Sequence, residues 1–265
     1  MKLAYNQAPD LSYWWLDGYF DFNEQQTPRV RDELTKLFAW HRASELPKTA
    51  DLLAQAGQLM AGEVSASQAC RVYEQGRSLI DNVSNQALPA MAGIAPTITP
   101  SQIEHLKGKY AKTADEFRRD FIRGSAEDRA AKRLKETLSR SETLYGKLEE
   151  AQINAIKQAL TTSSFDPAFA LRERQRRQQE LIELLTNLAA AKASPETSQH
   201  ALRGYIQRAW DSPDPAYRAY VQRLTAQACV SFATIHASTT PVQRANAVKV
   251  FKGYEADLRA LAAQK

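Results

Sequence analysis

The sequence has few of the residues that build stapled or sheet-rich proteins. In 265 residues it contains only 2 Cys, 10 Gly and 11 Pro, and the Gly and Pro counts are low for a β-sandwich of this length. Cys70 and Cys229 are too far apart in sequence to form a metal or redox motif. They are either two ordinary thiols, as in a cytosolic protein, or one disulfide, as in an oxidising compartment.

Long apolar runs are also missing. No run approaches the roughly 20 residues that a membrane-spanning helix needs. A secretory signal peptide is not recognisable either, because Met1-Lys2-Leu3 leads directly into Ala4-Tyr5-Asn6-Gln7. We therefore expect either a cytosolic protein or a mature chain in which a start Met replaces the processed end.

The motifs of the common enzyme chemistries are absent. There is no Walker loop, no GxGxxG and no GxSxG, and the four histidines are scattered without an HExxH pair. The sequence therefore predicts no catalytic residue, no metal site and no cofactor. The alternative is an enzyme whose site is assembled across helices, around His41 or His105 with distant carboxylates.

One acidic segment, Asp17–Glu24, superficially resembles a calcium-binding loop. It lacks the Gly and the closing Glu at the positions that such a loop requires. Asp21 with Glu24, or Asn23 with Gln26, explains it more simply as a capping pair that opens the next helix.

Excess charge of one sign is small, with 35 Lys+Arg against 30 Asp+Glu, a net charge of +5. The signs are mixed along the chain, so we do not expect nucleic acid as a partner. The strongest basic patch lies within Leu171–Gln179 and contains Arg172, Arg174, Arg176 and Arg177. We interpret it as an ion-paired, solvated helix face, and binding of anionic lipid, nucleic acid or an acidic protein segment is the alternative.

Helix-start signals, in contrast, are abundant. A Ser, Thr or Asp precedes a Pro at seven places, a pairing that caps an orphan amide and presets a helical φ: Thr27-Pro28, Thr99-Pro100, Asp166-Pro167, Ser194-Pro195, Ser212-Pro213, Asp214-Pro215 and Thr240-Pro241. Three starts add Gln as in a capping box, namely Ser65 with Gln68, Thr99 with Gln102, and Thr240 with Gln243.

Between these starts the apolar residues fall at helical spacing, and no segment alternates like a strand. The pattern predicts an all-α fold, an elongated antiparallel bundle or stacked array of about eight or nine helices. The segment Gly124–Thr162 is one long helix or two. We expect a single domain over residues 1–265, with a sub-division into 1–95 and 96–265 as the alternative, and we find no repeat of fixed period.

Aromatic residues gather near the N-terminus. They belong either to a helix that packs into the core or to a binding surface. A binding surface is plausible chemically because rigid aromatic side chains supply contact area at little entropic cost. Three consecutive aromatics at positions 13 to 15 cannot all face one side of a helix, so at least one is exposed or contacts a partner. The candidate protein-binding residues are Trp14, Trp15, Tyr19 and Phe20.

Several separated motifs resemble an uncharacterised family of proteobacterial envelope lipoproteins. They span about two thirds of the chain and comprise Leu3-Ala4-Tyr5-Asn6-Gln7, Trp15-Leu16-Asp17-Gly18-Tyr19, Trp40-His41-Arg42 with Glu45-Leu46-Pro47, Thr99–Leu106, and Asp166-Pro167 followed by Leu171–Gln178. Members carry a signal peptide and a lipidated Cys just before the segment that matches Leu3 to Gln7, and this sequence has neither. Ile98-Thr99-Pro100-Ser101-Gln102 is in addition similar to the Leu-Thr-x-x-Gln motif of small periplasmic helical chaperones.

The resemblance implies a periplasmic protein associated with the outer membrane through a lipid anchor. No activity of the family is carried over to particular residues. Together with the missing catalytic motifs, it favours a non-enzymatic protein-binding factor, chaperone-like or an envelope assembly adaptor. Its partners would be other envelope proteins or unfolded clients.

Overall fold

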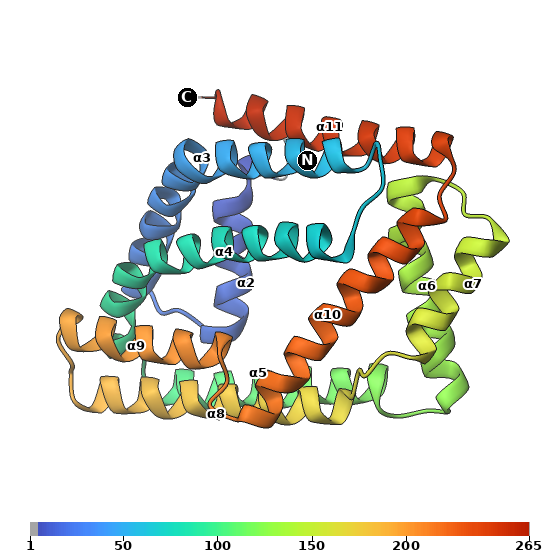
Figure 1. The fold of residues 1–265 in the computed structure, drawn as a ribbon. Coiled ribbons are helices and arrows are strands. Elements are labelled where there is room, and N and C mark those ends of the chain that lie inside the picture. Colours follow the sequence, from blue (N-terminus) through green and yellow to red (C-terminus); the bar gives the residue numbers. More distant parts are fainter. Residues whose placement is uncertain (1–4, 265) are drawn as a thin grey trace. The chain divides into compact units, whose positions relative to one another are not determined.

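The structure, a computed structural model, describes residues 5–264, so Leu3 and Ala4 of the first family motif lie outside the described residues. The described residues form ten α-helices and one 3-10 helix, η1, and contain no strand (Figure 1). The all-α prediction is therefore confirmed. The helices are α2 (Ala8–Phe20), α3 (Gln26–Leu59), α4 (Ala66–Ile94), η1 (Ala95–Thr97), α5 (Pro100–Phe121), α6 (Ala126–Tyr145), α7 (Glu150–Thr161), α8 (Pro167–Ala190), α9 (Pro195–Trp210), α10 (Pro215–Ala237) and α11 (Pro241–Ala262).

The helix count differs slightly from the eight or nine expected. The segment from Gly124 to Thr162 is two helices, because Gly146 adopts a φ of 77° between α6 and α7, a conformation that favours glycine. Helix α3, in contrast, continues through Pro47. Leu46 and Ala50 on either side of this proline are buried, which offsets the lost backbone hydrogen bond.

Most of the predicted helix starts are present as caps. The side chains of Thr99, Asp166, Ser194 and Thr240 each accept a hydrogen bond from a backbone N–H in the first turn of their helix. Ser212 is an exception, since it lies in the loop before α10, where its hydroxyl accepts from the backbone N–H of Asp214 at 3.2 Å.

Two compact units divide the chain, and each consists of three separate stretches. The first unit contains the stretch that ends at His41, then Asp81–Ile122 and Asp166–Arg218. The second contains Arg42–Ile80, Arg123–Phe165 and the stretch that begins at Ala219. This division differs from a boundary at residue 95, because α3 and α4 each contribute residues to both units.

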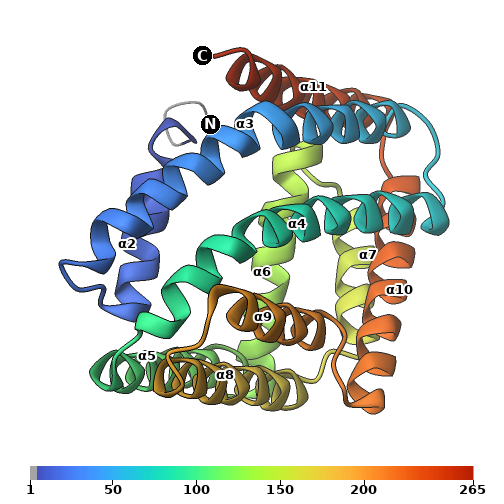
Figure 2. The ribbon, with the colours of Figure 1, turned by 90° about the vertical axis from the view of Figure 1, so that its left-hand side faces the viewer.

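In the first unit, α5 and α9 each pack against α8, and α5 and α8 lie side by side (Figure 2). Their shared core includes Leu88, Leu106, Leu185 and Leu202, all at most 4% exposed. A smaller cluster joins α2 to α3 through Tyr13, Val30 and Leu34.

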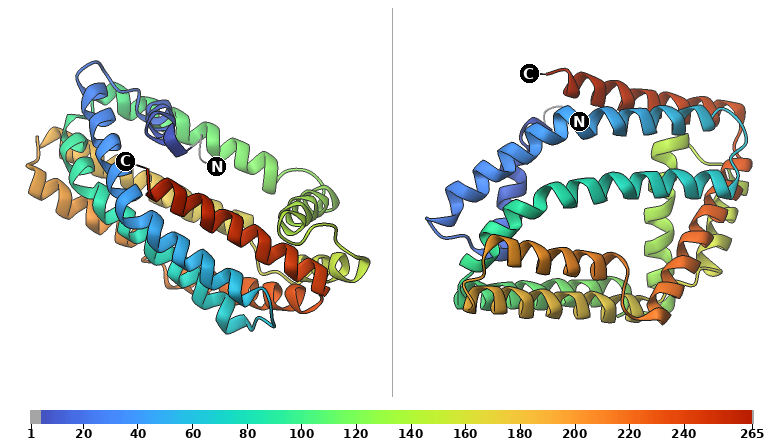
Figure 3. Two further views of the ribbon diagram at one scale, coloured as in Figure 1. Left: turned by 90° about the horizontal axis from the view of Figure 1, so that it is seen from above. Right: turned by 60° about the vertical axis from the view of Figure 1, so that its left-hand side comes forward.

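In the second unit, α11 lies along the later part of α3 (Figure 3). A Cβ atom added to Gly57 would lie 3.0 Å from the Cβ of Phe251, so the glycine allows this close approach. Arg259 reinforces the contact through an ion pair with Asp51, at 2.8 Å. The core beneath contains Met60, Tyr145, Leu148, Ile156 and Ala247.

A pair of buried glutamines, which we call a glutamine clasp, holds each unit together. In the first clasp the side-chain amides of Gln26 and Gln102 bond to each other, with Nε2 to Oε1 distances of 3.2 and 2.7 Å. Each Oε1 also accepts the N-cap backbone N–H of its own helix, that of Asn23 or Thr99. Asn23 with Gln26 is thus the capping pair of the acidic segment that looked like a calcium loop.

The second clasp repeats this arrangement with Gln152 and Gln243, at 2.9 and 3.0 Å. In both clasps each Nε2 also donates to the carbonyl two residues before the other glutamine's N-cap residue. Those carbonyls are Thr97, Asp21, Ser238 and Lys147. All four amides are therefore fully hydrogen-bonded although each glutamine is at most 6% exposed.

Candidate interaction surface on helix α2

Helix α2 begins and ends at defined residues. A proline at its start, Pro9, supplies a helical φ, and Asp10 places a negative charge in the first turn. The helix ends at Phe20. Its C-cap residue Asp21 has a left-handed φ of 48°, and Asp17 Oδ1 accepts the backbone N–H of Phe22 at 2.9 Å. The end of the helix is thus fixed by its own side chains.

The inner face of α2 is anchored by Tyr13. Its ring is 7% exposed, and its hydroxyl lies 2.9 Å from Thr27 Oγ1. The guanidinium of Arg31 stacks over this ring, 3.8 Å from its centroid, and binds Asp10 at 2.6 Å. These contacts with α3 set the rotation of α2 about its axis.

With that rotation the opposite face of α2 carries large apolar side chains into solvent. Leu11 is 45% exposed, Trp14 61% and Trp15 63%. Their i, i+3, i+4 spacing places them on one side of the helix, and we call them the α2 outer face. Two of the four residues predicted to bind protein, Trp14 and Trp15, belong to it.

The other two predicted residues point elsewhere. Tyr19 and Phe20 are half-buried and pack against the core of the first unit. The Tyr19 ring contacts Trp15, with centroids 4.9 Å apart, and Lys109 Nζ lies 5.2 Å from the Tyr19 centroid. The structure therefore separates the aromatic cluster into an exposed pair and a packed pair.

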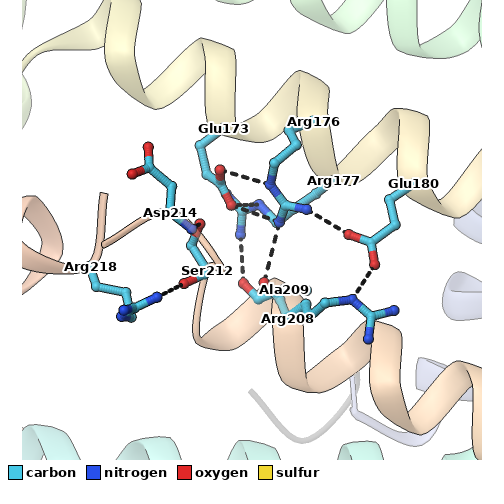
Figure 4. A network of polar contacts seen from close by, with 9 residues as sticks. All are labelled: Glu173, Arg176, Arg177, Glu180, Arg208, Ala209, Ser212, Asp214 and Arg218. Carbon is cyan, nitrogen blue, oxygen red and sulfur yellow. Dashed lines mark hydrogen bonds and ion pairs between the residues drawn. The ribbon is translucent and has the colours of Figure 1, made fainter. Parts of the chain in front are cut away.

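Two arginines of the basic patch on α8, Arg176 and Arg177, are part of a network of ion pairs and hydrogen bonds (Figure 4). Arg176 binds the buried carboxylate of Glu173 at 2.9 Å and that of Glu180 at 2.6 Å. Glu180 in turn binds Arg208 on α9 at 2.6 Å. Burial would raise the pKa of Glu180, but hydrogen bonds from Arg208 and Arg176 outweigh it and lower the pKa.

Arg176, together with Arg177, also caps the C-terminus of α9. Arg177 Nη1 donates to the carbonyl of Ala209 at 3.1 Å, and Arg176 Nη2 donates to that of Arg208 at 3.3 Å. A cation is favoured at that helix end. Arg176 and Arg177 thus join α8 to α9, and Arg172, stacked over Phe169, and Arg174 are the members of the patch outside this network.

The histidines do not converge. His41 Nδ1 lies 2.8 Å from the hydroxyl of Tyr5, and His105 lies near the carbonyl of Gly18. His236 is fully buried between the hydroxyl of Tyr145 and the carbonyl of Gly62 in the second unit. Within residues 5–264 no group of three or more His, Cys, Asp or Glu side chains is arranged to hold a metal ion.

Cys70 and Cys229 form a disulfide that joins α4 to α10 within the second unit. The bond closes a loop of 159 residues. The sequence left open whether the two cysteines are free thiols or one disulfide, and in the structure they are a disulfide.

Each unit also contains an apolar pocket, and the spacing of apolar residues in the sequence did not predict either one. The first, of about 390 Å³, lies among α2, α3, α4, α8 and α9 of the first unit. The second, of about 520 Å³, lies in the second unit and has Cys229 in its lining. Neither lining contains a histidine. Among the described helices, none has an apolar stretch sufficient to traverse a bilayer.

A family model described as "Family of unknown function (DUF6279)" matches residues 18–218. The chain belongs to this family. The region that matches the DUF6279 model contains the first glutamine clasp and the arginine network. It ends at Arg218, where the first unit also ends. No significant match was found among curated proteins or among solved structures.

Proposed function

We propose that the protein is a non-enzymatic protein-binding factor of the bacterial envelope, acting as a chaperone or as an assembly adaptor. Its partners are other envelope proteins or unfolded clients. The α2 outer face carries this proposal, because Leu11, Trp14 and Trp15 form an exposed apolar stripe on a well-anchored helix.

Physical chemistry favours protein contact at such a stripe. Exposed tryptophans keep a large apolar area in water, and burying that area against a partner is favourable. Trp is also enriched among the residues that dominate binding energy, and an amphipathic helix face fits a partner's groove through i, i+3, i+4 anchors. The Tyr13 anchor holds the helix in place before binding, which reduces the entropy lost on association.

Two observations support an envelope location. A disulfide between Cys70 and Cys229 is typical of an oxidising compartment. The sequence motifs resemble envelope lipoproteins. A lipid anchor at the outer membrane is part of the same proposal.

The test is suppression of aggregation of thermally unfolding citrate synthase by the purified chain. We expect suppression by the wild type and its loss in the double variant Trp14→Ala/Trp15→Ala. Because truncating a central Trp costs about 2 kcal/mol or more, affinity should fall at least about 30-fold.

The matched control is Trp210→Ala, since Trp210 is also exposed, at 42%, but lies on α9. It should suppress aggregation like the wild type. Site-specific photo-crosslinking from position 14 in intact cells tests the adaptor role. If the wild type neither suppresses aggregation nor crosslinks to an envelope protein, the proposal is wrong.

Binding of anionic lipid or nucleic acid through Arg172–Arg177 stays a second proposal. Because Arg176 and Arg177 are held by Glu173, Glu180 and the end of α9, it would depend on Arg172 and Arg174. An enzyme site around His41 or His105 likewise stays a proposal.

A further inference from the structure

The pocket of the first unit has an almost wholly apolar lining. Leu34, Leu37, Ala87, Ala90, Leu181 and Leu185 are typical of its walls. Its volume of about 390 Å³ falls at the lower end of the range of small-molecule sites, which suits one narrow ligand.

Polar groups are confined to a few positions of this pocket. The polar lining residues are Glu33, Lys36, Gln86 and Tyr205. The side chain of Lys36 is 62% exposed, and that of Glu33 is 33% exposed, so this pair marks the edge of the pocket that faces water.

The apolar interior of the pocket favours a hydrocarbon ligand over a peptide. A peptide backbone inside the pocket would leave its N–H and C=O groups without partners, whereas an unbranched hydrocarbon chain has no such groups.

The charges at this edge have both signs. Lys36 Nζ lies 3.0 Å from Glu33 Oε1 and 2.7 Å from Asp32 Oδ2. The group therefore has one ammonium and two carboxylates, of which Glu33 lines the pocket and Asp32 lies just outside its lining. A ligand with a single negative charge at its head would meet a net negative edge, while a zwitterionic head would find a partner for each of its charges.

We propose that this pocket binds the acyl chain of a single-chain phospholipid with a phosphoethanolamine head. The hydrocarbon occupies the apolar lining, the phosphate contacts Lys36, and the ammonium contacts Glu33. The site is independent of the α2 outer face, because Trp14 and Trp15 do not line it.

The direct test compares two lysophospholipids with the same acyl chain, below their critical micelle concentrations, by calorimetry. We expect lysophosphatidylethanolamine to bind about three- to fivefold more tightly than lysophosphatidylglycerol, since charge pairs at a partly exposed edge discriminate modestly. Affinity should rise up to about fourfold with each added methylene until the pocket is full. Equal binding of the two heads, tighter binding of the phosphoglycerol lipid, or no dependence on chain length would overturn the proposal.

Matched variants on one helix locate the ligand. Ala90 and Ala69 are both half-buried alanines of α4, but Ala90 lines the first pocket and Ala69 the second. Ala90→Phe should weaken lysophosphatidylethanolamine binding at least about tenfold, because its ring fills the space of the chain, and Ala69→Phe should leave binding unchanged. The reverse result would place the lipid in the other pocket and contradict the proposal.

A second pair of variants keeps the test decisive if Ala90→Phe fails to fold. Glu33→Gln should remove most of the preference for the phosphoethanolamine head. Glu104→Gln is its control, because Glu104 makes the same i,i+3 ion pair, with Lys107 at 2.7 Å. If both variants keep the wild-type preference, or if an apolar peptide rather than lipid fills the pocket, the proposal is wrong.

Discussion

At the scale of single residues, the buried His236 has a hydrogen-bond partner at each ring nitrogen, and these partners fix its neutral tautomer. Because a carbonyl only accepts, Nε2 donates its proton to Gly62 O at 2.8 Å, and Nδ1 accepts from the Tyr145 hydroxyl at 3.0 Å. Burial lowers the pKa of His236 below its ordinary value of 6.5, and the charge of Arg244 lowers it further, although the Gly62 bond opposes this. Burial also raises the pKa of Tyr145 to about 12, so the phenol keeps its proton.

The sign of the pH dependence follows from this lowered pKa. Between the unfolded and the folded pKa, the unfolded chain binds more protons than the folded one. The free energy of unfolding should therefore be fully retained above about pH 6.5 and should fall as the pH drops through it, by at most about 1.4 kcal/mol per pH unit. Urea unfolding of the wild type and of His236→Gln, at several pH values between about 5 and 8, measures the difference.

The exposed His200 provides the control for this measurement. His200→Gln should keep the pH dependence of the wild type, and His236→Gln should flatten it. A wild-type curve that is parallel to that of His236→Gln would contradict the assignment.

At the scale of helices, the Gln of a capping box has two different roles in this protein. It either caps only its own helix or also bonds a segment far away in sequence. Gln68 caps α4 with Ser65 in an exposed box, with Ser65 N to Gln68 Oε1 at 2.8 Å. Gln102 makes the same box with Thr99 but is buried and also bonds Gln26 and Asp21. Gln102 therefore holds together segments far apart in the chain, and Gln68 stabilises only its own helix.

Substituting each glutamine by leucine measures the difference. Gln102→Leu should lower the free energy of unfolding by about 3 kcal/mol or more, because several buried polar groups lose their partners. Gln68→Leu should cost about 1 kcal/mol or less, as an exposed cap does. Urea unfolding followed by circular dichroism compares the two, and equal losses would show that the clasp adds nothing to the cap.

At the scale of the whole molecule, the Cys70–Cys229 disulfide belongs entirely to the second unit. Replacing both cysteines by alanine should lower the free energy of unfolding by roughly 2–4 kcal/mol, because the unfolded chain regains the freedom of a long loop. Hydrogen exchange should show the loss of protection in the second unit, including α11, with the first unit little changed. Reductant should reproduce the effect in the wild type and leave the double variant unaffected, and equal losses in both units would contradict this expectation.

The sequence predicted the helices well, because caps such as Thr99 with Gln102 are local and depend on neighbouring residues. The pairing of Gln26 with Gln102 was missed, since the partners are 76 residues apart, whereas those of the second clasp are 91 apart. No fixed period relates the two clasps. Each has one Thr N-cap, Thr99 or Thr240, but the other N-cap is Asn23 in the first and Glu149 in the second. What the two clasps share is therefore the pattern of contacts between the glutamines, which becomes visible only in the folded structure.

The candidate site was predicted only in part for a similar reason. Consecutive aromatics required that one side chain face outward, but the contacts of Tyr13 decide that Trp14 and Trp15 do so. Arg176 and Arg177 of the arginine run pair with Glu173, but their role in capping α9 depends on a helix about 30 residues away in sequence. The pocket arises from five helices, so no single segment carries its signature.

The interleaving of the two units has a consequence for biosynthesis. A chain that emerges from a ribosome or a translocation channel in order presents the last stretch of the first unit before the last stretch of the second. The first unit has all its segments once Arg218 has emerged, whereas the second waits for the C-terminal helices α10 and α11. Cys70 in α4 emerges long before Cys229 in α10, so its thiol can react with an oxidant or with another cysteine until Cys229 has emerged.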